Sequence, residues 1–349
     1  MSGFDSFIGN EKLIERLKRD VASSRISHAY IIEGVEGSGK RTLARLICMS
    51  ISCSADERPC MECIGCSKIL RDQSPDVITV TAEKGKVQLG VDVIRKIRED
   101  SAFAPNELPK KFYIIPFADT MNDAAQNALL KILEEPPPHV MFMLLSENAD
   151  NLLSTIRSRA PILRTQALDD ELVCKYLTEN DSTAKRLRDS DPEAFNAAVK
   201  LSRGSIGKAL SLVGGKRAEE CLSFYRSAEQ YLEMLASRRD AVSELKFYEF
   251  ATKLATAKQR AELSAIYSLL ADAARDLVLC KLTREPKTVF YTTAEKARAV
   301  ADSFALGKLM ALVDVFVDAK NTLERNANVS LSQVCTFCNA VAATRTNRR

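Results

Sequence analysis

The residues with the clearest chemistry form a glycine-rich run at positions 34–40, GVEGSGK. The run follows an apolar segment typical of a strand and precedes a helical pattern, which is the setting that a phosphate-binding loop requires. Glycines let backbone N–H groups turn inward, and the lysine supplies positive charge for the β and γ phosphates. A glycine turn before a helix also arises by chance, but strand, spacing and lysine together favour a nucleotide loop. The candidate nucleotide-binding residues are Gly34, Gly37, Gly39, Lys40, Arg41 and Thr42.

Two positions that should serve Mg²⁺ hold unsuitable side chains. The residue after the lysine is normally Ser or Thr, whose hydroxyl binds the metal, and here it is Arg41. Thr42 comes one residue too late, and such a shift rotates a side chain about 100° around a helix. A later strand should be followed by acidic residues and is followed by Pro116-Phe117. Asp119 lies further on and could be proposed as a substitute acid, but a helix cap is the favoured interpretation. We therefore expect little hydrolysis, while nucleotide binding through the loop backbone and the lysine stays open.

Four of the ten cysteines stand close together, in the pattern Cys-x6-Cys-x2-Cys-x2-Cys. Four thiolates are enough to hold a tetrahedral Zn²⁺ without any other residue type. An iron–sulfur cluster also uses four thiolates, and unligated cysteines are a further alternative, but no redox partner motif accompanies them. Zinc is therefore the favoured cofactor, in a structural role because the protein fills all four positions. The candidate ligands are Cys53, Cys60, Cys63 and Cys66.

The other six cysteines are interpreted as packing residues. Four are isolated among apolar neighbours, as small core residues are; these are Cys48, Cys174, Cys221 and Cys280. Cys335 and Cys338 lie in an apolar helical run near the C-terminus with no second pair close by. We expect their side chains to be buried as well.

The elements that must position these residues indicate an α/β domain followed by helices. The first half alternates short apolar runs with helical patterns, which predicts a parallel sheet flanked by helices. The expected strands are 29–33, 77–81, 111–115 and 140–146, and the expected helices are 11–23, 40–51, 90–101 and 124–135. From about 165 to 215 the helical segments are short, and beyond that they are longer. The sequence predicts three domains, at 1–165 with the cysteine module at about 53–66, at 166–215 and at 216–349.

Composition excludes several classes of protein. With 46% hydrophobic and 28% charged residues, the chain is typical of ordinary soluble proteins. Its net charge of +4 is too small to predict nucleic-acid binding by itself, so any DNA contact must be local. The N-terminus lacks the apolar core of a secretory signal, and no run approaches the roughly 18 apolar residues of a membrane span. We expect a cytoplasmic protein with no membrane partner.

Four segments match one family in order and spacing: SRISHAYIIEGVEGSGKRTLARL, CSADERPCMECIGC, QNALLKILEEPP and TIRSRAPIL. They resemble the bacterial clamp-loader subunits of DNA polymerase III, gamma/tau and delta-prime, over about residues 4–210. The resemblance implies an AAA+ domain with a zinc module, a helical lid and a helical collar for oligomerisation. It also implies partners, namely the other loader subunits (gamma/tau and delta), the sliding clamp and primed DNA. The implied function is to help open the sliding clamp and load it onto that DNA during replication.

Departures from the family pattern separate its two kinds of subunit. Motor subunits resemble complete ATPases and carry a nucleotide-sensing Arg in a G-S-L-R pattern of the lid, whereas here the run Gly204-Ser205-Ile206 is followed by Gly207. Together with Arg41, this favours a partner subunit without ATPase activity of its own. The alternative is an active motor of the gamma/tau kind.

Ser158 and Arg159 match the first two residues of the family's S-R-C motif, and Ala160 stands in the third place. The resemblance implies that Arg159 is an arginine finger, which reaches the γ-phosphate held by a neighbouring subunit. Such a finger stabilises transition-state charge and is worth about a thousandfold or more in rate. Without the resemblance, an ordinary surface arginine would be the simpler interpretation. The expected catalytic contribution is thus made in trans, with none in cis.

Overall fold

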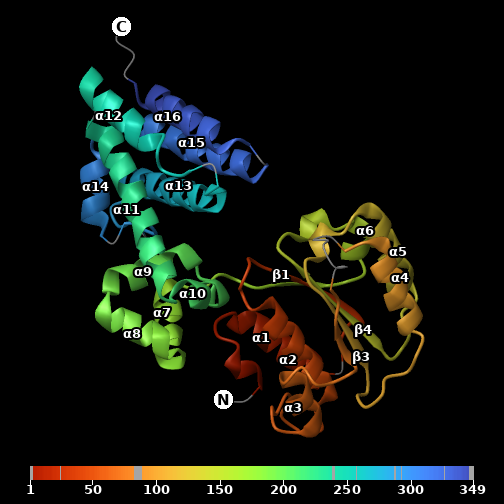
Figure 1. Cartoon of the computed structure of the whole chain (residues 1–349). Coiled ribbons are helices and arrows are strands. Elements are labelled where there is room, and N and C mark those ends of the chain that lie inside the picture. Colours follow the sequence, from red (N-terminus) through yellow and green to blue (C-terminus); the bar gives the residue numbers. More distant parts are fainter. Residues whose placement is uncertain are drawn as a thin grey trace. The chain divides into compact units, whose positions relative to one another are not determined.

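The computed structural model describes residues 3–345 apart from 24, 82–88, 238–239, 257, 287, 292 and 326. The N-terminal half is built on a parallel five-stranded sheet of order β2-β3-β4-β1-β5 (Figure 1). The strands are β1 (Ala29–Glu33), β2 (Val77–Thr79), β3 (Lys111–Ile115), β4 (Val140–Ser146) and β5 (Ile162–Arg164). Since all strands are parallel, their carboxyl ends meet at one edge, and ligands of open α/β sheets bind outside that edge. The candidate phosphate loop, residues 34–40, leaves β1 there.

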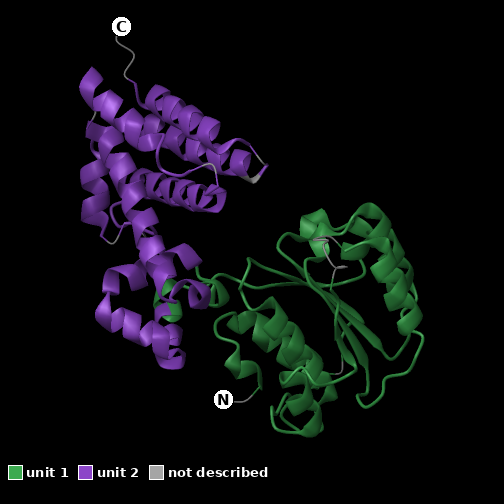
Figure 2. Cartoon of the chain, in the orientation of Figure 1, with its two compact units in different colours: residues 1–173, 204–208 green, residues 174–203, 209–349 purple. Residues whose placement is uncertain are grey.

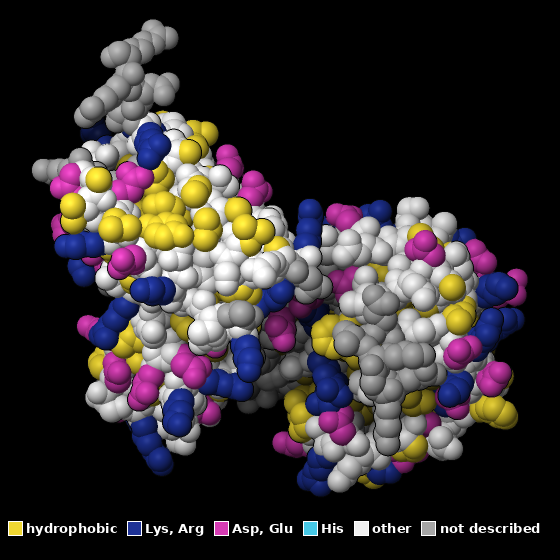
Figure 3. All heavy atoms as spheres, turned by 45° about the horizontal axis from the view of Figure 1, so that its top comes forward, with side chains coloured by type: hydrophobic (Ala, Val, Ile, Leu, Met, Phe, Trp, Pro, Cys, Tyr) yellow, Lys and Arg dark blue, Asp and Glu magenta, His cyan; other side chains and the backbone are white. Residues whose placement is uncertain are grey.

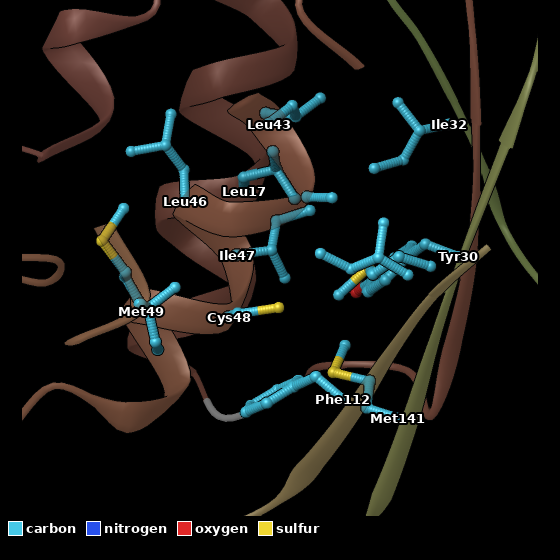
Figure 4. Packing of buried hydrophobic residues seen from close by; sticks show 14 of the residues in the cluster. Leu17, Tyr30, Ile32, Leu43, Leu46, Ile47, Cys48, Met49, Phe112 and Met141 are labelled. Atoms are coloured by element: carbon cyan, nitrogen blue, oxygen red, sulfur yellow. The ribbon is translucent and has the colours of Figure 1, made fainter. Parts of the chain in front are cut away.

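Helices cover both faces of the sheet, because successive strand residues point to opposite sides. The helices and 3-10 turns of this half are η1 (Gly3–Ser6), α1 (Glu11–Ala22), α2 (Lys40–Ser52), α3 (Ile64–Leu70), α4 (Val91–Asp100), η2 (Ala118–Thr120), α5 (Asp123–Glu134), η3 (Ala149–Asn151) and α6 (Ser154–Arg157). On one face, Tyr30 and Ile32 pack with side chains of α1, α2 and α3 (Figure 4). On the other face, Ile31 and Tyr113 pack with side chains of α4, α5 and α6.

The predicted α/β class with a parallel sheet is confirmed, and so are its four expected strands, of which β2 ends two residues early. β3 and β4 are buried along their whole length, as central strands covered on both faces are. The fifth strand, β5, was not expected. It has three residues, which is too short for an alternating pattern to be recognised.

The chain separates into two compact units, residues 1–173 with 204–208 and residues 174–203 with 209–349 (Figure 2). In the described part of the second unit all regular elements are helices, as expected for the C-terminal part. They are α7 (Asp170–Asn180), α8 (Ser182–Ser190), α9 (Pro192–Ser202), α10 (Ile206–Leu212), α11 (Lys216–Ser237), α12 (Ala241–Ala251), α13 (Arg260–Leu282), α14 (Ala294–Ala301), α15 (Leu306–Glu324) and α16 (Val329–Thr344), where α7 and α10 begin in the first unit. The domain boundaries expected at 165 and 215 stay a prediction. None of the described helices combines the length and apolar character that crossing a membrane requires.

The expectation that Cys335 and Cys338 are buried is wrong, since both are exposed on α16. The buried face of this helix is formed instead by residues such as Ser332, Thr336 and Ala340. The sequence around the two cysteines is apolar on both sides of the helix, so hydrophobicity alone did not reveal which side faces the core.

A buried carboxylate fixes the loop that leads into β3. Asp76 is fully buried just before β2, and its two oxygens accept backbone N–H groups of Asn106, Glu107 and Leu108 at 2.7 to 2.8 Å. Burial by itself raises the pKa of this carboxyl, but the three N–H donors outweigh it and the pKa lies below its ordinary value. The charged form of Asp76 is thus built into the fold.

Replacing Asp76 by asparagine is expected to lower the free energy of unfolding by about 2–4 kcal/mol at pH 7, because the amide turns a donor toward backbone N–H groups that need an acceptor. The folded pKa of Asp76 lies below the unfolded one. Its carboxylate therefore contributes stability above the unfolded pKa, and this contribution is lost as the pH falls through the folded pKa. In urea titrations, the difference between wild type and variant should shrink as the pH falls below about 4.

The control is Asp92→Asn, at an exposed ion pair with Arg95, which should change the free energy of unfolding by less than about 0.5 kcal/mol. A difference between wild type and Asp76→Asn that stays constant on acidification would contradict the assigned role of the charge.

Candidate phosphate loop, metal centre and arginine finger

The phosphate loop joins β1 to α2, as the sequence predicts, and its shape depends on two glycines. Gly37 and Gly39 have φ values of 71° and 85°, in the left-handed region that side chains other than glycine rarely adopt. Gly39 is the residue that precedes the first turn of α2. The two glycines thus allow the chain to turn from the sheet edge into the helix within a few residues.

Residues 204–208 close over the tip of this loop. The Gly207 N–H donates to the Gly37 carbonyl at 3.1 Å, and the Ser205 hydroxyl donates to the Glu36 carbonyl at 2.8 Å. A Cβ atom at Gly207 would lie 3.0 Å from the Gly37 Cα, so a side chain there would press on the loop backbone. A side chain at position 207 would therefore fit only if the loop backbone moved by a few tenths of an ångström.

The ammonium of Lys40 is bound by the loop itself. Its Nζ donates to the carbonyls of Gly34 at 2.5 Å and Val35 at 3.0 Å. Burial of the ammonium lowers the pKa of Lys40 below its ordinary value, although the carboxylates of Glu147 and Asp119 act in the opposite direction. A phosphate would have to compete with these two carbonyls for the lysine.

Arg41 and Thr42 are both exposed at the start of α2. The guanidinium of Arg41 donates to the Thr79 hydroxyl at 3.3 Å, at the end of β2. The hydroxyl of Thr42 is on the next residue around the helix and belongs to a different face. The place where a metal-binding hydroxyl would stand thus carries a cation.

The end of β3 offers no acid in the expected place. Pro116 follows the last strand residue, and Phe117 has a left-handed backbone and a side chain that is 59% exposed. Asp119 accepts the backbone N–H groups of Glu147 and Asn148 through Oδ2, at 3.0 and 3.2 Å. It therefore anchors the turn after β4, which is a structural role, although as a loop anchor and not as the expected helix cap.

Thr165 supports the loop through its contact with Ser38, and neither residue was predicted from the sequence. The Thr165 hydroxyl is 2.8 Å from the Ser38 hydroxyl and donates to the Glu33 carbonyl at 3.1 Å. A Cβ atom at Gly34 would lie 1.9 Å from the Thr165 oxygen, so this side chain fills the space beneath the loop. Thr165 is 127 residues from Ser38, and no local pattern links residues so far apart.

The four predicted cysteine ligands come together beside α2 and α3. Their Sγ atoms all lie within 4.8 Å of one another, and those of Cys53 and Cys63 are 4.0 Å apart. Four sulfurs around a tetrahedral zinc are about 3.8 Å apart, given a Zn–S distance of about 2.3 Å. The backbone N–H of Cys60 donates to Cys53 Sγ at 3.4 Å, and that of Cys63 to Cys60 Sγ at 3.3 Å. The cluster can hold a metal ion.

The acidity of the thiols also fits a metal centre. Backbone N–H donation lowers the pKa of Cys63 to about 6, chiefly from Cys66, and lowers the pKa of Cys60, chiefly from Cys63. Burial raises the pKa of the Cys66 thiol, so that a bound cation would be needed to keep it ionised. Four sulfur donors with N–H groups directed at them suit zinc, which would tie the end of α2 to α3.

Arg159 lies at the surface just after α6, in contact with α5. Its Nη2 is 2.8 Å from Glu134 Oε1 and its Nη1 donates to the Thr155 carbonyl at 2.9 Å. The arginine side chain is 35% exposed. Ser158 closes the end of α6 by donating to the Thr155 carbonyl at 3.0 Å, while Ala160 is fully buried in the sheet core, where a small residue is required. The arrangement leaves the guanidinium accessible from outside.

Comparison with known proteins identifies the relatives of this chain. Residues 9–169 match the family model described as "DNA polymerase III, delta subunit". The gamma subunit of DNA polymerase III from Buchnera aphidicola subsp. Acyrthosiphon pisum is 31% identical over 60% of this chain and 57% of its own length. The delta' subunit from Escherichia coli is 28% identical over 70% of this chain and 74% of its own length.

Among solved structures, a DNA polymerase III gamma subunit-related protein from Thermotoga maritima covers 95% of this chain and 99% of its own, with 19% identity and a TM-score of 0.41. The chain spans about half the length of the gamma subunit that it matches. Residues 9–169, somewhat less than half of the chain, thus resemble the delta-subunit-like clamp-loader family of DNA polymerase III, and the chain is similar to gamma, tau and delta' subunits.

Proposed function

We propose that this chain is a delta-prime-type subunit of the DNA polymerase III clamp loader. It assembles in the cytoplasm with gamma/tau and delta subunits, and helps to open the sliding clamp and place it on primed DNA. It does not hydrolyse ATP itself, and it contributes Arg159 to the nucleotide site of a neighbouring subunit. The match to the delta' subunit supports this assignment because it extends over 254 residues, against 212 for the gamma subunit.

The observation that carries the proposal is a phosphate loop without the means to use Mg²⁺. Arg41 replaces the metal-binding hydroxyl and contacts Thr79, and Pro116 and Phe117 stand where the metal ligand and the water-polarising acid are needed. A guanidinium cannot bind a cation, and neither proline nor phenylalanine can act as a base. Gly207 in contact with Gly37 adds a third loss on the other side of the site. A subunit with these features can take part in assembly but not in turnover.

The cysteine cluster is assigned to structural zinc. All four ligand positions are filled by protein, so no position is open for substrate or water. The metal would join the end of α2, which begins at the phosphate loop, to the start of α3. Its contribution is to hold this part of the domain in one shape.

The helical unit supplies the surface for assembly in this proposal. Figure 3 shows hydrophobic side chains gathered on a face of this unit. Large exposed hydrophobic side chains of the unit include Val242 and Leu245 on α12 and Leu331 on α16. These two helices touch through Tyr248 and Phe337, whose rings lie 5.2 Å apart. Exposed apolar patches of this kind mark protein interfaces, and here the occupant is another loader subunit.

The isolated chain is expected to show no steady Mg²⁺-dependent ATP hydrolysis, since it lacks both the metal-binding hydroxyl and the strand-end acids. The measurement is phosphate release at saturating ATP, with Lys40→Ala as the matched variant, and the two proteins should give the same background rate.

Clamp loading is tested by omission: a loader reconstituted without this chain should fail to load the clamp onto primed DNA.

The alternative function is an active motor of the gamma/tau kind, which the 31% identity to the gamma subunit favours. Turnover by the isolated chain that disappears in Lys40→Ala would establish this alternative and overturn the proposal. Loading that proceeds equally well without the chain would reject a role in the loader altogether.

A further inference from the structure

Besides a 3.4 Å contact with the hydroxyl of its neighbour Ser158, the guanidinium of Arg159 is held by two acceptors from different helices. The Thr155 carbonyl, on α6, accepts from Nη1 at 2.9 Å, and the Glu134 carboxylate, at the end of α5, accepts from Nη2 at 2.8 Å. A guanidinium has five N–H donors in a rigid fork. These two contacts fix the plane of the fork and leave other N–H groups unused for a phosphate.

The two helices that bring this pair together are themselves locked to each other. Gln126 of α5 accepts the Leu153 N–H at 2.8 Å, directly before α6 begins, and donates to the carbonyls of Met121 and Asn151. Ile132 and Leu133 near the end of α5 and Ile156 of α6 are buried in the same core. α5 and α6 lie side by side (Figure 1), so Glu134 at the end of α5 and Arg159 just after α6 are held near each other by packed elements.

A contribution to folding stability does not explain why Glu134 and Arg159 form this ion pair. Its partners are 35% and 50% exposed, and exposed pairs contribute little to folding. The chain offers a closely matched pair for comparison: Arg157, also 35% exposed and two residues before Arg159 at the end of α6, contacts Asp150 at 2.6 Å. That contact lies within one surface segment, whereas the Glu134 contact ties the arginine to the end of a neighbouring core helix.

We infer that Glu134 is a positioning residue for Arg159, holding its guanidinium in the direction from which it meets the phosphate of a neighbouring subunit. The inference rests on the proposed function, since it requires Arg159 to act in trans. Fixing a long side chain beforehand removes the entropy cost of ordering it in the transition state. Glu134 acts through its hydrogen-bond acceptor, so glutamine, which keeps the Oε1 atom, should preserve the effect.

The test uses the complete reconstituted loader, with the arginine fingers of the other interfaces replaced so that the measured ATPase rate reports the interface that this chain completes. Glu134→Ala is expected to lower kcat about tenfold, the cost of leaving one long side chain unordered, with KM for ATP unchanged. Glu134→Gln should stay within about twofold of wild type. Asp150→Ala, which frees Arg157, is the matched control and should leave kcat unchanged.

Adding Glu134→Ala to Arg159→Ala should not lower kcat further, because Glu134 acts only through the guanidinium that Arg159→Ala has removed. A normal kcat in Glu134→Ala beside a slow Arg159→Ala would overturn the inference and leave the finger in place. A normal kcat in Arg159→Ala would instead remove the finger from the proposed function. The positioning role would also be overturned if Glu134→Ala and Glu134→Gln lowered kcat equally. It would likewise be overturned if a lower melting temperature of Glu134→Ala accounted for the lower kcat of that variant.

Discussion

Replacing Cys66 by serine is expected to reduce the zinc content of the purified chain from one equivalent to less than about a tenth of an equivalent. A hydroxyl is a poor ligand for zinc, and three cysteines leave the fourth position to water. Structural zinc contributes on the order of 10 kcal/mol in isolated zinc-binding peptides, because metal binding and folding are coupled. Cys66 is also fully buried, with its Sγ 3.8 Å from the Met49 carbonyl. We expect the free energy of unfolding to fall by about 4 kcal/mol or more.

Metal analysis of protein purified without chelators, together with urea unfolding, measures both effects. The matched control is Cys48→Ala, a buried thiol on α2 outside the cluster, which should keep its zinc and lose only about 1 kcal/mol for the small cavity. Wild-type protein with less than about half an equivalent of zinc, or with iron instead, would show that the cluster has been assigned to the wrong metal.

Arg159→Ala is expected to slow ATP hydrolysis about a thousandfold at the interface that this chain completes, because a guanidinium stabilises charge that develops on the transferred phosphoryl group. The side chain is accessible and makes an ion pair that contributes little to stability, so assembly and ATP affinity of the motor sites should be unchanged. Clamp loading should fall with the rate. The measurement is the DNA- and clamp-stimulated ATPase of the reconstituted loader at saturating ATP, which separates chemistry from binding.

In the proposed loader the other motor interfaces have fingers of their own, so the total ATPase of an otherwise unmodified loader should fall only in part. Arg157→Ala is the control, since this arginine has the same exposure and lies two residues away, at the end of α6, but is paired with Asp150. Equal ATPase and loading rates for Arg159→Ala and wild type would reduce Arg159 to a surface arginine.

The elements of the α/β half could be predicted because their signals are local. The strands around 111–115 and 140–146 are continuous apolar runs, and the four cysteines are close enough in sequence to be recognised as one set. β5 could not be predicted, since three residues carry no periodicity and are held in the sheet by pairing with β1. Cys335 was placed wrongly because an apolar helix does not disclose which of its faces meets the core.

The side chains that hold the site residues in place could not be predicted from the sequence, because they are distant from their partners along the chain. Ser205 contacts the Glu36 carbonyl across 169 residues, and Glu134 meets Arg159 across 25. Such contacts depend on the tertiary fold and leave no pattern in a single sequence. The same holds for Asp119, whose acidic side chain drew attention as a possible catalyst and proves to bind two backbone N–H groups.

The backbone contact between Gly37 and Gly207 has a consequence for the two segments that it joins. A Cβ atom at position 207 would lie 3.0 Å from the Gly37 Cα, and a Cβ atom at position 37 would lie 2.7 Å from the Lys208 backbone nitrogen. Gly37 also has a φ of 71°, which residues other than glycine rarely adopt. A substitution at either glycine would therefore displace the backbone of the other segment, so the tip of the loop and the start of α10 are shaped together.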